Sequence, residues 1–170
     1  MDLAIRPFAE ADAGPVCDLF VRINRLLAPP EQQAAFEDYI ALSIAEEIGR
    51  IEAYYAAHGG AFFVADDAGK IAGMFGLERV SPEAMELRRM YVAPELRRRG
   101  IAGAMLAFAE KECARRGFPA LELSTSELQR EALAFYRNAG YALEREEVAA
   151  AASNKTVGGG IRRFYFSKQV

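Results

Sequence analysis

The stretch "MYVAPELRRRGIAGAMLAFAEKECARRGF", Met90–Phe118, decides the fold, because it joins a strand to an amphipathic helix through a short arginine-rich turn. The strand is expected to end at Pro94, and five turn residues lead to a helix that begins near Arg98. Three consecutive arginines precede Gly100 at this junction. They either coat a solvated surface or belong to a turn that holds a negatively charged ligand.

The charge distribution along the chain favours a defined anionic ligand. The 170 residues carry a net charge of −3. Between Arg88 and Arg116, seven arginines and one lysine face three glutamates, a local charge of +5 that leaves −8 for the remaining residues. A general nucleic-acid binder usually has a basic surface overall, so we do not expect this chain to bind nucleic acid. A local positive field indicates a smaller anion.

Composition indicates one globular domain over residues 1–170, without a metal site. Hydrophobic residues make up 52% and charged residues 26% of the chain, which is ordinary for a globular protein. The N-terminal residues do not form a secretory signal and no apolar run reaches membrane-spanning length, so we expect a cytoplasmic protein with no membrane partner. The two cysteines, Cys17 and Cys113, lack metal-ligand spacing.

Hydrophobic periodicity predicts seven strands and several helices. The strands are expected near residues 2–8, 61–66, 70–80, 85–93, 119–125, 141–148 and 161–170. The helices are expected at residues 10–27, 98–116 and 129–139, with one long helix from Pro30 to His58. Hairpins imply antiparallel pairing, whereas the strand–helix–strand segment from Leu87 to Ser124 implies a parallel pair. The fold class is therefore α/β (α+β), a mixed sheet with helices on both faces.

Two further expectations concern the strand before the turn and the end of the chain. Alternation assigns the strand two faces: Glu86, Arg88, Met90 and Val92 on one, and Leu87, Arg89 and Tyr91 on the other. Residues 149–160, rich in alanine and glycine, are predicted to form a long mobile loop. The last strand is expected to offer an edge through which two copies of the chain could pair as a homodimer.

The junction has the chemistry of a phosphate site. The first amides of a helix have no intrahelical partner, and the helix dipole adds positive potential there. Gly100 allows a bulky group to approach the backbone, and the small residues Ala102 and Gly103 leave further room. A nucleotide-hydrolysing P-loop would need Gly-Lys-Ser/Thr, and a dinucleotide fold would need GxGxxG; the turn contains neither.

The pattern Arg97-x-x-Gly100-x-Ala102, preceded by "MYVAPE" and followed by an amphipathic helix, resembles the acyl-CoA pyrophosphate loop of GNAT-type N-acetyltransferases. The segment "LQREALAFYRNAGYAL" resembles the second signature of that family. Its matching residues are Ala132, Tyr136, Gly140 and Tyr141, while Gln129 stands where asparagine is usual. The likeness covers most of the chain and is clearest from Glu86 to Tyr141.

This resemblance implies a largely antiparallel sheet of about seven strands, with acetyl-CoA as co-substrate and no metal. In the family, the strand before the loop binds pantetheine through its main chain. Met90 N–H would then face the thioester carbonyl, Val92 N–H a pantetheine amide, and the amides from Arg98 to Gly103 the pyrophosphate. The residues implied to bind the cofactor are Met90, Tyr91, Val92, Arg97, Arg98, Arg99, Gly100, Ile101, Ala102, Gly103, Gln129 and Tyr136.

The resemblance also implies catalytic residues. Met90 N–H would stabilise the oxyanion, and Tyr136 would protonate the departing thiolate, unless Tyr136 is only an aromatic core residue of its apolar helix. Glu86 occupies a position where some members place a base, so it is the first candidate to deprotonate the amine. Glu78 is the second candidate. Tyr91 is a weaker one unless the strand carries a bulge, and a reaction without any side-chain base is the remaining alternative.

The expected function is acetyl transfer from acetyl-CoA to a primary amine of a small molecule, protein or peptide. The alternative is a non-catalytic CoA-binding module of the same fold that regulates a partner. Two features suggest different acceptors. The acidic residues of the long helix suit a cationic amine or simply form a solvated face; they are Asp38, Glu46, Glu47 and Glu52. Arg162 and Arg163 could instead pair with a carboxylate, such as that of an amino acid.

Overall fold

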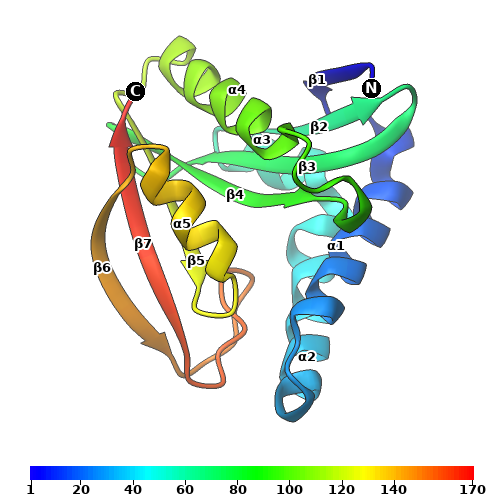
Figure 1. Cartoon of the computed structure of the whole chain (residues 1–170), viewed down its shortest axis with the longest axis vertical. Helices are drawn as coiled ribbons and strands as arrows, with labels where there is room; N and C mark the ends of the chain where they lie inside the picture. The colour runs from blue at the N-terminus through cyan, green and yellow to red at the C-terminus, as the bar shows by residue number, and fades with distance from the viewer.

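The computed structural model describes residues 1–170 and contains one seven-stranded sheet in the order β1-β2-β3-β4-β5-β7-β6 (Figure 1). The strands are β1 (Leu3–Pro7), β2 (Ala61–Asp67), β3 (Lys70–Arg79), β4 (Ala84–Val92), β5 (Ala120–Ser126), β6 (Ala142–Ala149) and β7 (Ile161–Gln169). The α-helices are α1 (Ala13–Leu27), α2 (Gln33–Glu46), α3 (Ile51–Ala57), α4 (Ile101–Arg115) and α5 (Arg130–Asn138). Short 3-10 turns lie at Glu10–Asp12, Pro30–Gln32, Ile48–Arg50 and Pro94–Leu96. None of the helices is long and apolar enough to cross a membrane.

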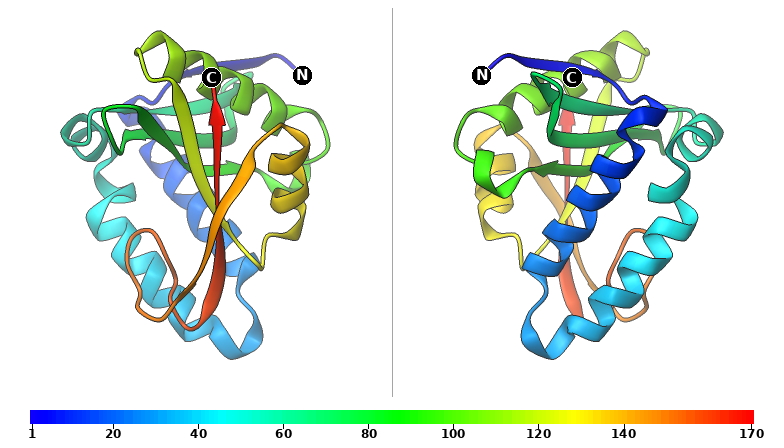
Figure 2. Two further views of the ribbon diagram at one scale, coloured as in Figure 1. Left: turned by 90° about the vertical axis from the view of Figure 1, so that its left-hand side faces the viewer. Right: turned by 90° about the vertical axis from the view of Figure 1, so that its right-hand side faces the viewer.

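The sheet lies between two layers of helices, as the sequence predicted. α4 and α5 pack against one face, and α1, α2 and α3 pack against the other (Figure 2). Only β4 and β5 run parallel to each other; all other neighbouring strands are antiparallel. The mixed, largely antiparallel sheet is therefore confirmed.

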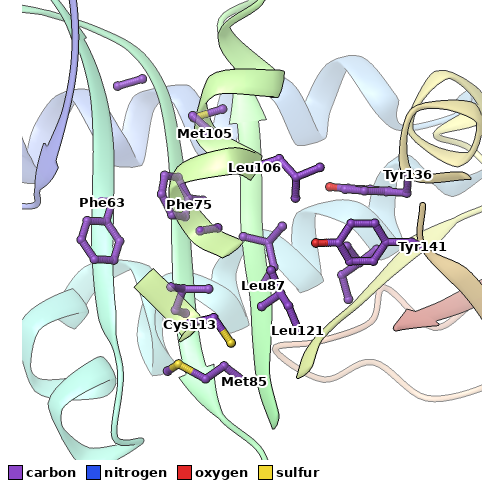
Figure 3. Close-up of a cluster of buried hydrophobic side chains, with 14 of the residues drawn as sticks. Phe63, Phe75, Met85, Leu87, Met105, Leu106, Cys113, Leu121, Tyr136 and Tyr141 are labelled. Atoms are coloured by element: carbon purple, nitrogen blue, oxygen red, sulfur yellow. The ribbon is translucent and has the colours of Figure 1, made fainter. Parts of the chain in front are cut away.

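Each helix layer buries its own apolar cluster against the sheet. On one side, α4 presents Met105, Leu106 and Cys113 to a cluster that includes Phe75 of β3 and Leu121 of β5 (Figure 3). On the other side, the apolar stripe of α1 packs against residues of α2, α3 and the sheet. Burial of apolar surface contributes roughly 25 cal/mol per Å², so these two seams supply most of the favourable free energy of folding.

The helix after the arginine-rich turn begins at Ile101 rather than near Arg98. The preceding Pro94–Leu96 segment forms a 3-10 turn. Arg98 and Gly100 then adopt left-handed backbone conformations, with φ of 63° and 79°. A left-handed residue cannot continue a right-handed helix, so α4 starts only after Gly100.

The C-terminal strand β7 is not an edge of the sheet. It pairs with β5 on one side and with β6 on the other, so the edges are β1 and β6 (Figure 1). The expectation that two copies pair through an exposed C-terminal strand is wrong, because the main-chain groups of β7 already bond on both sides. The β6–β7 hairpin folds back so that its second strand, and not its first, meets β5.

The long helix predicted from Pro30 to His58 is broken in the middle. α2 ends at Glu46 and α3 begins at Ile51, and a 3-10 turn lies between them. Glu47, at the break, has a non-helical backbone with φ −138° and ψ −65°. Periodicity alone predicted one helix because isoleucines on both sides of the break reach the same core.

The break places the Glu47 carboxylate inside the protein, beside two arginines of β4. None of its surface is exposed (0%). Arg89 donates to it at 3.0 and 3.1 Å, and Arg88 makes a further, short contact with the same carboxylate. The Tyr55 hydroxyl in α3 also donates to it, at 2.7 Å. A buried charge is costly unless it is paired and hydrogen-bonded, and here both carboxylate oxygens have partners.

β4 carries a bulge where the two arginines meet Glu47. Arg89 has φ 54°, and the β3–β4 register shifts so that Arg89 and Met90 together lie opposite Phe75. In a regular strand, neighbouring side chains point to opposite faces, so two consecutive arginines could not reach one carboxylate. The extra residue of the bulge allows both to do so.

The bulge corrects the predicted faces of this strand, because the alternation is inverted beyond it. Met90 packs against the cluster on the α4–α5 side. Tyr91 instead lies on the α1–α3 side, with its ring 6.2 Å from that of Phe20 in α1. Glu86 and Met90 therefore do not share a face. Tyr91 and Glu86 share a face instead. The strand therefore carries the bulge that Tyr91 needed in order to be a candidate base.

Residues 150–160 form the loop that was predicted, but contacts with the sheet hold it in place. The carbonyl oxygen of Asn154 accepts a hydrogen bond from Arg89. The ammonium of Lys155 lies 3.0 Å from a carboxylate oxygen of Glu78 in β3. The loop thus closes against the sheet instead of extending freely into solvent. Together these contacts form an ion cluster, which comprises Glu47, Glu78, Glu86, Arg88, Arg89 and Lys155.

Replacing Glu47 with glutamine removes the anion that two buried arginines share. Burial by itself would raise the pKa of Glu47, but the charges of Arg89 and Arg88 outweigh burial and hold this pKa at about 2, below the ordinary 4.5. A lowered pKa in the folded state means that the carboxylate stabilises the fold above pH 4.5 and loses this effect as pH falls toward 2. We expect Glu47→Gln to lower the free energy of unfolding by about 3–5 kcal/mol near neutral pH.

Urea unfolding followed by circular dichroism measures both effects. The difference in unfolding free energy between wild type and Glu47→Gln should shrink as the pH falls below about 4.5. Glu46→Gln, at the exposed neighbouring position, is the matched control and should change stability by less than about 0.5 kcal/mol. Unchanged stability of Glu47→Gln, or a loss independent of pH, would contradict the role of the buried carboxylate.

Candidate functional site

β4 and β5 separate along their length and leave a cavity between them. They pair only where Ala84–Leu87 lies beside Ala120–Leu123. Beyond these residues the two strands diverge, β4 continuing to Val92 and β5 to Ser126 (Figure 1). The cavity at this divergence encloses about 960 Å³, its open mouth included.

Four parts of the chain line this cavity: β4, β5 with α5, the α1–α2 pair, and the loop before β7 with the start of that strand. The residues are Asn24, Leu27, Phe36, Tyr39, Glu86–Tyr91, Leu123–Ser126, Gln129, Ala132, Tyr136, Ala149, Asn154–Gly158, Ile161 and Arg163. The predicted site residues among them are Glu86, Met90, Tyr91, Gln129 and Tyr136. The structure therefore brings the three predicted catalytic residues into one cavity.

A second feature lies at the start of α4, outside this cavity. The six consecutive amides from Arg98 to Gly103 donate to no backbone carbonyl, and no side chain caps the helix. Ile101 is buried and offers only its main chain here, whereas no atom lies within 4 Å of where a Cβ on Gly103 would stand. Free amides at a helix N-terminus, reinforced by the helix dipole, form a binding site for phosphate groups.

The arginine side chains of the turn surround these amides without occupying them. Those of Arg97, Arg98 and Arg99 are all exposed. Arg98 lies 3.6 Å from Glu131 of α5 in an exposed pair, which contributes little to stability. The three guanidinium groups are therefore available to an anionic ligand at the start of α4.

The main chain of β4 beyond the bulge presents amides to the gap between the strands. The amide of Ala93 donates to the carbonyl oxygen of Ala72 in β3 at 2.9 Å. Amides alternate in direction along a strand, so those of Val92 and Met90 point away from β3. They face the side where β5 no longer pairs with β4.

Glu86 lies at the cavity wall, whereas Glu78 lies behind it. The carboxylate of Glu86 contacts Arg88 at 3.2 Å and Lys155 at 3.4 Å, and its side chain is 22% exposed. Glu78 is buried and accepts a hydrogen bond from the Tyr54 hydroxyl at 2.7 Å. Of the two candidate bases, only Glu86 lines the cavity.

Tyr136 is both a core aromatic residue and a cavity residue. Its ring packs against that of Tyr141 (Figure 3). It also packs against the ring of Phe166 in β7. Burial raises the pKa of Tyr136 well above its ordinary value, so its hydroxyl remains protonated at neutral pH. The neighbouring Tyr141 hydroxyl instead donates to Glu110 at 3.0 Å and lies outside the cavity.

Tyr91 and Gln129 also line the cavity, but neither is suited to act as the base. Burial raises the pKa of Tyr91, and the other nearby charges leave that direction unchanged, so its phenol is a poor proton acceptor. The Asn24 amide lies 3.5 Å from its hydroxyl. Gln129 directly precedes α5, and its side-chain oxygen accepts a hydrogen bond from the Thr125 hydroxyl at 2.8 Å. Its amide hydrogens remain for a ligand.

The acidic residues of the predicted long helix, which suggested a cationic acceptor, do not line the cavity. Asp38, Glu46 and Glu52 are exposed and do not line the cavity. Glu47, which was placed with them on a solvated face, is instead buried in the ion cluster. The turn between β3 and β4 does not line the cavity either.

Sequence reasoning missed the contribution of α1. Asn24 is buried, lines the cavity and donates to the carbonyl oxygen of Phe20 at 2.9 Å. It falls four residues after Phe20, on the apolar stripe of its helix. A polar residue on a buried stripe needs a partner, and this is the signal by which it could have been found.

Comparison with known proteins agrees with these features. Residues 20–141 match the family model described as "Acetyltransferase (GNAT) family". A rat protein, "N-acetyltransferase family 8 member 3", is 31% identical over 112 residues, which cover 62% of this chain and 49% of that protein. Human "N-acetyltransferase 8" is 26% identical over 110 residues, covering 61% of this chain and 48% of its own length. The chain thus spans about half the length of these relatives.

Solved structures share the fold at low sequence identity. PaiA N-acetyltransferase from Thermoplasma acidophilum, in complex with coenzyme A, superposes with a TM-score of 0.77 at 19% identity, covering 100% of both chains. A GNAT family acetyltransferase from Elizabethkingia anophelis, with acetyl-CoA bound, superposes with a TM-score of 0.65 at 14% identity, covering 99% of both. Since the family match runs from α1 through α5 and includes the free amides of α4 and the divergence of β4 and β5, the chain belongs to the acetyltransferase (GNAT) family.

Proposed function

We propose that this protein uses acetyl-CoA to acetylate a primary amine of a small molecule or peptide, by direct transfer and without a metal. The observation that carries the proposal is the run of six unpartnered amides from Arg98 to Gly103, close to a cavity lined by Glu86 and Tyr136. The amides fit a pyrophosphate, and the cavity fits an amine with groups that exchange protons.

Acetyl-CoA fits these residues by charge and by main-chain geometry. Its pyrophosphate would bind the amides from Arg98 to Gly103, with the exposed guanidinium groups of the turn around it. Its pantetheine would bond the outward amide of Val92 in the gap between β4 and β5. When bound, it supplies an acetyl thioester. The neighbours from Thermoplasma acidophilum and Elizabethkingia anophelis, solved with coenzyme A and acetyl-CoA, support this assignment.

The proposed proton transfers use the two ionisable residues on opposite sides of the gap. Glu86 takes a proton from the incoming ammonium, directly or through one water, and is held at the cavity wall by Arg88 and Lys155. The amide of Met90 donates a hydrogen bond to the acetyl oxygen as it gains negative charge. Tyr136, protonated because it is buried, gives its proton to the departing sulfur.

A non-catalytic module that binds CoA and regulates a partner is the alternative function. Such a module would need the amides of α4 but not Glu86 or Tyr136. Glu86 and Tyr136 both line the cavity that the amides of β4 face. We therefore favour the enzyme. Thiol release in the presence of amines separates the two: the module binds acetyl-CoA without turnover.

A negative charge at the start of α4 should weaken acetyl-CoA binding while preserving the fold. Gly103→Glu places a carboxylate where space is open and where an acidic residue stabilises a helix, but it repels a pyrophosphate. We expect at least about a tenfold loss of affinity by calorimetric titration with acetyl-CoA. Ala107→Glu, one turn further along the exposed side of α4, is the control and should bind as wild type does. Equal affinity of the two variants for acetyl-CoA would show that the amides at the start of α4 do not bind its pyrophosphate.

Removing the Tyr136 hydroxyl should slow transfer without weakening acetyl-CoA binding. Tyr136→Phe keeps the ring packed in its cluster, so only the proton donor is lost. We expect kcat to fall by about a hundredfold, within the range typical of general acid catalysis, with an unchanged Kd for acetyl-CoA. Tyr141→Phe removes a neighbouring hydroxyl that lies outside the cavity and should retain kcat. Unchanged kcat in Tyr136→Phe would make this residue purely structural.

Replacing Glu86 should cause a loss of activity that depends on pH. We expect Glu86→Gln to lower kcat/KM about ten- to hundredfold near neutral pH, because the amine then arrives mostly protonated. The loss should fade at alkaline pH, where the amine is already neutral. Glu78→Gln is the comparison: if that variant shows the pH-dependent loss and Glu86→Gln does not, Glu78 is the base. A wild-type pH profile in both variants would indicate a reaction without a side-chain base.

A further inference from the structure

One cationic side chain of the cavity has no anionic partner. Arg163 lies near the start of β7, lines the cavity and is only partly exposed. The only hydrogen bond of its guanidinium runs to the hydroxyl of Ser124 in β5, at 2.9 Å. Its Nε atom is buried and has no hydrogen-bond partner. Burying part of a guanidinium without a counterion or a full set of acceptors costs free energy.

Every other cation that lines the cavity is neutralised. Arg88 and Arg89 share Glu47, and Arg88 also lies 3.3 Å from Glu78. Lys155 lies within 3.4 Å of the carboxylates of Glu78 and Glu86. The ion cluster thus holds three positive and three negative groups, and Arg163 adds one uncompensated positive charge.

The acidic residues of β6 beside this part of β7 pair with other arginines. Glu147 lies opposite Arg163 in the β6–β7 register, but its carboxylate pairs with Arg145. The adjacent Arg162 does not line the cavity and pairs with Glu146 at 2.8 Å. Of the two arginines that sequence analysis singled out, only Arg163 is therefore placed to meet a substrate.

We propose that the amine acceptor carries a carboxylate and that Arg163 binds it, so that the substrate is an amino acid or a similar amino-carboxylate. This inference rests on the proposed function. A carboxylate matches the single excess charge, and the planar guanidinium can bond both of its oxygens. The Ser124 hydroxyl lies beside the guanidinium as a further hydrogen-bond donor. Arg163 would fix the carboxylate end of the substrate while Glu86 meets its amine end.

A cationic acceptor, such as a polyamine, fits the cavity less well. The exposed acidic residues of α2 and α3 that suggested it lie outside the cavity. A second ammonium group would enter a cavity that already carries excess positive charge and would add repulsion. A phosphate monoester would bring two negative charges to a single unpaired arginine. The charge balance therefore favours one carboxylate.

The test uses the full chain with acetyl-CoA and four amino acids: leucine, phenylalanine, β-alanine and γ-aminobutyrate. Each is compared with its carboxamide. The kcat/KM measured by thiol release is divided by the fraction of the amine that is unprotonated at the assay pH. We expect the carboxylate form to be preferred by about ten- to hundredfold for at least one pair, mainly through KM. Arg163→Met should abolish this preference and leave the Kd for acetyl-CoA unchanged. Arg162→Met, whose arginine lies outside the cavity, should retain the preference.

A binding measurement keeps the inference separable from acetyl transfer itself. The wild-type protein and both variants are titrated calorimetrically with the N-acetyl forms of the same amino acids and with their carboxamides. Carboxylate-selective binding that depends on Arg163, without thiol release from any amine, would support the carboxylate site and defeat the proposed enzyme. Three results would overturn the carboxylate site. The first is turnover at equal rates for acids and carboxamides, and the second is a preference for the carboxylate that survives Arg163→Met. The third is the absence of both selective binding and selective turnover.

Discussion

The buried carboxylate of Glu47 meets two consecutive arginines of β4, and much of the structure around the cavity follows from that contact. A strand can present consecutive side chains to one partner only if its alternation is interrupted, so β4 bulges at Arg89. α2 stops before Glu47, and the non-helical backbone of this residue lies at the point where its carboxylate meets the arginines. The Asn154 carbonyl then bonds the same arginines, which draws the loop before β7 over the cavity.

The bulge also separates the two halves of the proposed chemistry. Before it, Glu86 and Arg88 point toward the α1–α3 layer, and Glu86 meets the open cavity there. Beyond it, Met90 turns toward the α4–α5 layer, where Tyr136 and the free amides of α4 lie. An acceptor can therefore approach from one side of the sheet and an acyl donor from the other, and they meet only where β4 and β5 have diverged.

Local features of the sequence were sufficient to predict the parallel pair around the crossover, the two helix layers and the arginine-rich turn before α4. Gly100, the arginines before it and the apolar spacing after it act within a few residues of one another, so the pattern itself carries the prediction. The ion cluster could not be predicted in this way, because Glu47 lies far from Arg88 in the sequence. Glu47 on an apparently solvated helix face and Arg89 on an apparently regular strand each had an ordinary local interpretation. The contact between Glu47 and Arg89 exists only in the folded protein, and it coincides with the break in the helix and the bulge in the strand.

The position of β7 has a consequence for how the chain reaches this structure. All six other strands are synthesised before β7, yet β7 lies between β5 and β6. Until it inserts, β5 has an open edge and β6 has no neighbour, and the cavity lacks the wall that carries Arg163. Non-local pairing of this kind forms slowly, and open strand edges promote association between chains. The half of the sheet that contains β5, β6 and β7 is therefore exposed to aggregation while the chain is being made, whereas the β2–β3 and β3–β4 hairpins can pair as they emerge.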